Sequence, residues 1–99
     1  MIYIQDSSVK RRSAPPILSN LERVSQEEWK RFNVHVSEGD RFFQQGDFES
    51  ARSAYHNALK INEDPDIVYA VGEIHLYLHN PAKAMEFFRR YMVLKSEEE

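Results

Sequence analysis

Residues 44–61 read QQGDFESARSAYHNALKI, a Gly-Asp pair followed by small and aromatic residues at regular steps. Gly46-Asp47 predicts a turn, because such pairs interrupt helical patterns. The apolar residues after the turn recur at intervals of three and four, which is the spacing of one helix face. They are Ala51, Ala54, Tyr55, Ala58, Leu59 and Ile61. The stretch therefore predicts a helix that packs a face of small and aromatic residues against a neighbour.

A long helix is predicted before this turn. Ser25-Gln-Glu-Glu28 has the pattern of a capping box, in which each of the two end side chains bonds the backbone amide of the other residue. The apolar stripe that follows consists of Trp29, Phe32, Val36, Gly39 and Phe43. Because this stripe is continuous, we expect one helix that ends near Gln45.

Two more helices are predicted after the quoted stretch. NEDPD, residues 62–66, interrupts the second helix because the residue before proline disfavours helical backbone, and its last aspartate is suited to cap the next helix. The third helix is expected over residues 67–78. Asn80-Pro81 supplies a cap and a first-turn proline for a fourth helix, which reaches about Lys95.

The chain divides near residue 20. Residues 21–99 carry no convincing strand pattern, so the sequence predicts an all-α domain there. Residues 1–20 contain SS, KRRS and APP, and we expect them to form an extended or flexible arm. The apolar tip, residues 1–4, is either a short strand or a frayed end. The initial methionine and the acidic run at the other end favour a complete chain.

A spacing of 33 residues connects the two halves of the helical domain. It relates Gly39 to Gly72, Ala51 to Ala84, and Tyr55 to Phe88. This pattern resembles the tetratricopeptide repeat, a helix-turn-helix unit of about 34 residues. The resemblance implies two units, about 33–64 and 66–95, stacked as a short α-solenoid of antiparallel helices. It also implies that the glycine and the alanine of each unit face each other, with the aromatic residue filling the space beyond. An unrelated helical bundle with coincidental spacing is the alternative.

The match to the repeat has departures. His35 and Glu38 stand where the family carries a large residue and a leucine, and Tyr91 replaces a small residue. A tyrosine at that position would hold a further unit away, so we expect the array to stop there. The surface around Phe87, Tyr91 and Leu94 then either closes the four-helix core or serves self-association or a partner.

The resemblance also implies a binding surface. Family members generally bind other proteins in a concave groove lined by the first helix of each unit. Carried over by position, the groove residues are Asn33, Val36, Asp40, Phe43, Gln44, Asp66, Tyr69, Glu73, Leu76 and Tyr77. The family's clamp for C-terminal carboxylates is absent, because Val36 and Asp40 occupy its first-unit positions. The remaining aromatic and acidic surface suits a basic or amphipathic segment anchored on Phe43, Tyr69 and Tyr77. The alternative for the carboxylates is a merely solvated face.

Two functional classes fit such a surface, and in both the partner is another protein. One is an adaptor or scaffold module that holds a peptide or amphipathic helix. The other is a small dedicated chaperone that shields a helical client before secretion or assembly. The arm carries a basic run, Lys10–Arg12, which is complementary to an acidic groove. The arm therefore either occupies its own or a neighbouring chain's groove or is a disordered tail.

Composition excludes several other classes. The net charge is −3; residues 1–20 contribute +2, which leaves 10 basic and 15 acidic residues in the helical domain. An acidic body is unsuited to nucleic acid, whose phosphates need a basic face. The absence of cysteine excludes disulfides and thiolate zinc sites. No apolar run is long enough to span a membrane, and the N-terminus lacks the charge order of a secretory signal. We therefore expect a cytoplasmic protein.

Catalysis and metal binding find little support in the sequence. His75 and His79 are four residues apart, but HLYLH lacks the glutamate that metallopeptidases carry between their histidines. A two-histidine metal site is the alternative, although a third ligand is not evident. We instead expect His75 in the interior and His79 in a turn. No Gly-rich phosphate loop or nucleophile elbow occurs. The sequence thus predicts a protein that is not an enzyme and uses no cofactor or metal.

Overall fold

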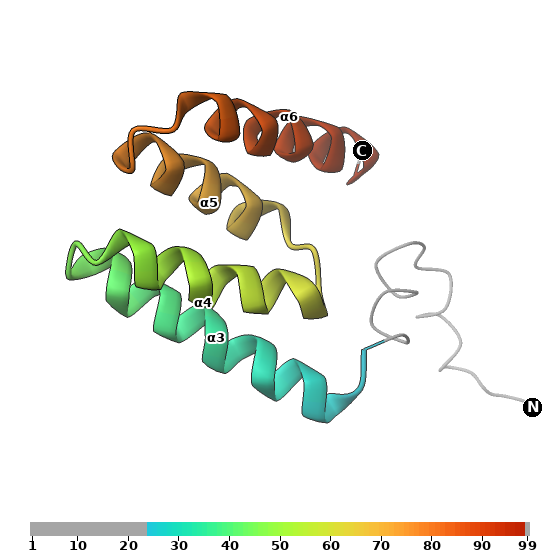
Figure 1. Ribbon diagram of the computed structural model, residues 1–99. Helices are drawn as coiled ribbons and strands as arrows, with labels where there is room; N and C mark the ends of the chain where they lie inside the picture. The colour runs from blue at the N-terminus through green and yellow to red at the C-terminus, as the bar shows by residue number, and fades with distance from the viewer. Residues whose placement is uncertain (1–23, 99) are drawn as a thin grey trace, which may run out of the picture.

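The computed structural model describes residues 24–98, and in this part of the chain the fold is all-α. The four helices are α3 (Gln26–Gln44), α4 (Phe48–Ile61), α5 (Pro65–Tyr77) and α6 (Pro81–Glu98). Figure 1 shows them as two stacked antiparallel hairpins, α3 with α4 and α5 with α6, whose two turns lie on the same edge of the stack. The predicted all-α helical-repeat class is confirmed. The predicted arm, residues 1–20, lies outside the described residues.

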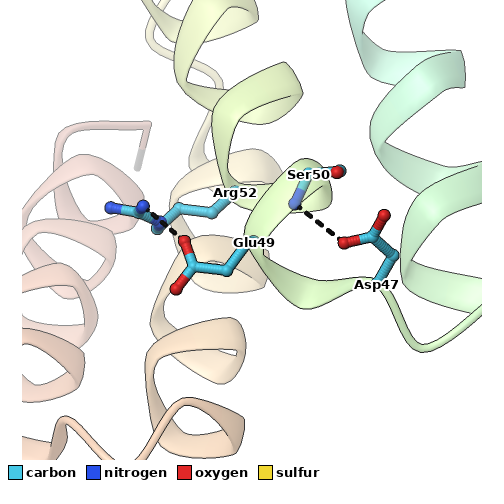
Figure 2. A network of polar contacts seen from close by, with 4 residues as sticks. All are labelled: Asp47, Glu49, Ser50 and Arg52. Carbon is cyan, nitrogen blue, oxygen red and sulfur yellow. Dashed lines mark hydrogen bonds and ion pairs between the residues drawn. The ribbon is translucent and has the colours of Figure 1, made fainter.

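The first two helices begin as the sequence predicts. The Ser25 hydroxyl accepts the Glu28 amide at 3.1 Å, and the Glu28 carboxylate accepts the Ser25 amide at 3.0 Å, so the capping box is complete. Asp47 caps α4 by accepting the Ser50 amide at 3.2 Å, as Figure 2 shows. These bonds satisfy amides that the first turn of a helix leaves without partners.

The third helix begins earlier than the sequence predicts. Asp64, not Asp66, is its cap, and Pro65 is its first residue. The reason is that proline suits the first helical position. Its fixed φ is already helical, and an N–H group at that position would have no acceptor in the helix, so proline loses no hydrogen bond by lacking one. The Asp64 carboxylate accepts the Asp66 amide at 2.8 Å. The fourth helix extends to Glu98, beyond the expected end near residue 95.

The two turns repeat each other in detail. Asp47 N–H donates to Phe42 O at 2.9 Å, and 33 residues later Asn80 N–H donates to His75 O at 2.8 Å. Each turn also places its middle residue in the left-handed region, Gly46 at φ 82° and His79 at φ 61°. This is the hydrogen-bonded ending that helices commonly adopt around a left-handed residue. The 33-residue spacing is thus a geometric repeat as well as a sequence pattern.

The left-handed backbone at His79 gives a stability prediction. Only glycine adopts this conformation without a steric cost, which for other residues is about 1–2 kcal/mol. We expect His79→Gly to raise the free energy of unfolding, as measured by urea titration, by about 1 kcal/mol. This is a net value, because the relief of strain is partly offset by the larger conformational entropy of glycine in the unfolded chain. The matched control is Gly46→Ala, which introduces the same strain 33 residues earlier and should be destabilising. A destabilised His79→Gly variant would contradict this account of the turn.

The core lies between consecutive helices. The largest fully buried side chains, Val68, Val71 and Ile74, belong to α5, which packs against both α4 and α6. From α4, Ala51 and Ala58 are fully buried as well. Small residues on α4 and bulky ones on α5 let the two hairpins stack closely and bury apolar surface on both.

Each hairpin is held by an aromatic ring over a glycine. A Cβ atom added at Gly39 would lie 2.9 Å from Tyr55 Cγ, and one added at Gly72 would lie 2.6 Å from Phe88 Cε1. The expected close approach of the helices at these glycines is therefore present in both units. The contact partner of the glycine differs from the expectation, however. The alanine was expected to face the glycine, but the aromatic ring, Tyr55 or Phe88, lies directly against it. Ala51 is buried one turn before Tyr55 on the same helix.

Candidate functional site

Three aromatic rings gather where the first hairpin meets the end of α5, and we call Phe43, Phe48 and Tyr77 the aromatic cluster. Phe48 and Tyr77 stack with ring centroids 4.5 Å apart and planes 2° apart. Phe43 stands edge-on to both, at 5.5 Å from Phe48 and 5.9 Å from Tyr77. Tyr77 is 55% exposed, so the cluster presents an aromatic face to solvent. The structure thus brings together two predicted groove residues and adds Phe48, which the groove prediction did not include.

Two predicted acidic groove residues lie near a buried hydroxyl one turn away from the cluster. Asp40 on α3 accepts a hydrogen bond from the hydroxyl of Tyr55, whose side chain is buried. Burial raises the pKa of Tyr55 well above its ordinary value, and the Asp40 bond and the charges of Asp40 and Glu73 raise it further. Asp40 on α3 is bonded to the Tyr55 hydroxyl, and the charge of Glu73 on α5 acts on the pKa of the same group. We call these two residues the acid pair.

The Tyr55–Asp40 bond gives a prediction about stability. Asp40→Ala leaves the buried Tyr55 hydroxyl without its acceptor, so we expect a loss of about 1–3 kcal/mol. Tyr55→Phe in the same background removes the unpaired hydroxyl and should recover most of that loss. Chemical denaturation of the two single variants and the double variant measures the coupling. Additive losses would show that the two side chains do not interact in solution.

The burial of Tyr55, together with its bond to Asp40, predicts that stability depends on alkaline pH. Because the folded state raises the pKa of Tyr55 above the unfolded value of 10, the stabilisation is fully present below that pH and is lost as pH rises above it. Tyr55→Phe should show a smaller loss of stability over this range than the parent chain.

The other predicted groove residues have different local surroundings. Tyr69 packs against α6 instead, with its ring centroid 5.2 Å from Phe88 and 5.1 Å from Tyr91. Val36 is half-buried against the core. Asn33 lines an open depression along α3 together with Val34, Ser37, Glu38 and Arg41. The remaining three, Gln44, Asp66 and Leu76, are exposed.

The surface of the last hairpin remains rich in apolar side chains. Phe87 packs against the core, and Tyr91 and Leu94 are only partly exposed, so this end is closed in part. Other large apolar side chains of the two helices are about half exposed or more. These are Leu76, Tyr77, Met85, Met92 and Val93.

The histidines are placed as the sequence predicts. His75 is 7% exposed and stacks on Phe87, with ring centroids 5.5 Å apart, and His79 lies in the turn before α6. Within residues 24–98 no three histidine or acidic side chains are grouped closely enough to hold a metal ion. None of the four described helices is long and apolar enough to cross a membrane.

Comparison with known proteins gives no relative: no family model matches the chain, and neither a curated protein nor a solved structure matches it.

Proposed function

We propose that the protein is a non-catalytic interaction module that binds a peptide or amphipathic helix of another protein. The observation that carries the proposal is the aromatic cluster beside the acid pair. Phe43 follows Asp40 by three residues on α3, and Tyr77 follows Glu73 by four on α5, so each helix carries an aromatic residue one turn after an acidic one. Aromatic groups that are half exposed next to fixed charges are typical anchors in protein recognition.

The chemistry of this surface defines the ligand. The negative charges of the acid pair attract a lysine or arginine, and the aromatic cluster accepts an apolar side chain or the face of a guanidinium group. On each helix the acidic and aromatic residues are one turn apart, or roughly 5 Å along the axis. A ligand helix that carries a basic residue and an apolar residue one turn apart would meet both groups.

The helical-repeat arrangement supports the same function, which is the one that the resemblance to tetratricopeptide repeats implies. The two units have matching turns and matching aromatic–glycine contacts. These contacts hold the first helix of each unit, which carries the proposed binding residues, against the second. Of the two functions that fit this surface, we favour that of an adaptor. A dedicated chaperone for a helical client is the second, favoured by the exposed methionines Met85 and Met92, because methionine adapts to varied apolar partners.

The proposal is tested by a charge reversal that leaves the Tyr55 bond intact. Affinity purification of the tagged full chain from its native cells identifies partners, and the affinity of the recovered partner is then measured for Glu73→Lys and Glu97→Lys. Both variants change the net charge equally, but only Glu73 belongs to the acid pair. We expect Glu73→Lys to weaken binding at least tenfold and Glu97→Lys to leave it unchanged.

Two results of that experiment are decisive. Equal affinities of the two variants would place the binding surface elsewhere and overturn the proposal. The mass of the native complex separates the two roles, because a chaperone binds one client in fixed proportion and an adaptor remains in a larger assembly.

A further inference from the structure

A cavity of about 200 Å³ opens between α4 and α6 and has α5 as its floor. Its lining residues are Arg52, Ser53, His56, Val71, His75, Lys83 and Phe87. Val71 and His75 of α5 are buried, α4 contributes the three polar residues Arg52, Ser53 and His56, and α6 contributes Lys83 and the apolar ring of Phe87. None of these residues belongs to the aromatic cluster or the acid pair, so the cavity is a separate site.

The lining of this cavity is basic although the helical domain as a whole is acidic. It contains Arg52, Lys83 and two imidazoles, and no carboxylate. Two glutamates lie nearby as neighbours on the same helices: Glu49 pairs with Arg52 at 2.6 Å, drawn in Figure 2, and Glu86 approaches Lys83 to 3.8 Å. Both pairs are solvent-exposed on their helices, and exposed pairs of this kind are weak. A ligand of higher charge can therefore compete for both cations.

One donor in the lining lacks an acceptor. The Arg52 Nε atom is buried and has no hydrogen-bond partner among the described residues. Buried donors are nearly always paired, so an acceptor supplied from outside would complete this site. The Glu49 carboxylate bonds the other end of the guanidinium group, at a terminal nitrogen.

The buried imidazole of His75 is influenced by the charges around the cavity. The pKa of His75 is lowered, first by burial and then by the positive charges of Arg52 and Lys83. Glu49 and Glu86 act in the opposite direction but more weakly. The lowered pKa agrees with a lining that contains two cations and no carboxylate, an arrangement that favours an anion.

We propose that this cavity binds a phosphoryl dianion. Its charge matches the two fixed cations, Arg52 and Lys83, and its three oxygens can accept from several donors at once. Arginine, lysine, serine and imidazole donors surround the cavity on different sides, whereas a carboxylate has only two oxygens to share among them. The source is either a phosphorylated side chain of a protein or the free phosphate ion. This activity is independent of the peptide-binding surface proposed above.

The test follows the imidazole resonances of the full chain by NMR. Inorganic phosphate and a blocked phosphoserine amide are titrated separately, with sodium chloride at matched ionic strength as the reference. We expect saturable shifts of the His56 and His75 ring protons. We also expect the pKa of His75 to rise, because a bound dianion favours the charged imidazole. Tighter binding of the phosphoserine amide would identify a protein side chain as the source, and tighter binding of inorganic phosphate would identify the free ion.

Matched variants separate this site from general charge effects. Arg52→Gln combined with Lys83→Gln should weaken phosphate binding at least tenfold, while Arg89→Gln combined with Lys60→Gln, which removes two exposed cations outside the cavity lining, should not alter it. Circular dichroism melting confirms that the variants remain folded. The absence of saturable shifts at millimolar phosphate, or equal binding by the cavity double variant and the control double variant, would overturn the proposal.

Discussion

Replacing Ile74 by alanine should lower the free energy of unfolding by about 2–5 kcal/mol, the usual range for deleting a buried leucine or isoleucine side chain. Ile74 is fully buried in the middle of α5 and belongs to the core cluster formed with α4. Its removal leaves a cavity that neighbours from two helices would have to fill. Small domains hold only about 0.05–0.15 kcal/mol of stability per residue, so this loss is a large fraction of the total.

Urea denaturation followed by circular dichroism measures the effect, and α5 itself provides the control. Leu76 is two residues away and 50% exposed, so Leu76→Ala should change stability by only about 0.5 kcal/mol or less. Because both substitutions convert a branched aliphatic residue to alanine on one helix, their difference isolates burial. Similar losses for the two variants would show that α5 is not oriented as described.

Gly39→Leu should be comparably destabilising, by about 3 kcal/mol, at the upper end of the usual range for overpacking. The position has no space for even a Cβ atom, because the Tyr55 ring lies directly against it. Tyr55 cannot easily move aside, since its ring is buried and its hydroxyl is bonded to Asp40. The leucine would therefore force α3 and α4 apart.

A second substitution tests this explanation directly. Tyr55→Ala is itself destabilising, but in the Gly39→Leu background it makes room for the leucine. We expect the double variant to be more stable than the sum of the two single effects by about 1–3 kcal/mol, as measured in a thermodynamic cycle. Purely additive effects would mean that the residues do not touch, and the interpretation of the 33-residue spacing as a packing repeat would then be wrong.

Local features of the fold were predictable from the sequence. The Ser25 capping box, the Gly46-Asp47 turn and the Asn80-Pro81 start all depend on residues within one helical turn of each other. Interactions over that distance follow from the order of the chain alone. The start of α5 was predicted two residues too late. Asp64 and Asp66 flank Pro65, and either could serve as the cap by its side chain, but Asp64 is the cap in the structure.

Features of the candidate site that span helices were harder to predict. The stacking of Phe48 on Tyr77 and the bond from Tyr55 to Asp40 join residues whose relative distance depends on how the helices cross. The 33-residue spacing predicted which glycines and rings share a hairpin. It could not predict that Tyr69 turns toward α6, because that choice depends on the space left beside Phe88. The basic cavity, built from three helices, was missed for the same reason.

The stacking of consecutive helices has a consequence for how the molecule opens. The substantial interfaces join α3 to α4, α4 to α5 and α5 to α6, so each helix depends mainly on its neighbours in the chain. α6 is the last in this series, and Ala84 is its one buried residue among those described. Local unfolding should therefore begin at α6, and its amides should exchange with solvent faster than those of α4 and α5. Each such opening would uncover Gly72 and the adjoining side of α5, a surface shaped to receive a helix, whether α6 itself or one from another chain.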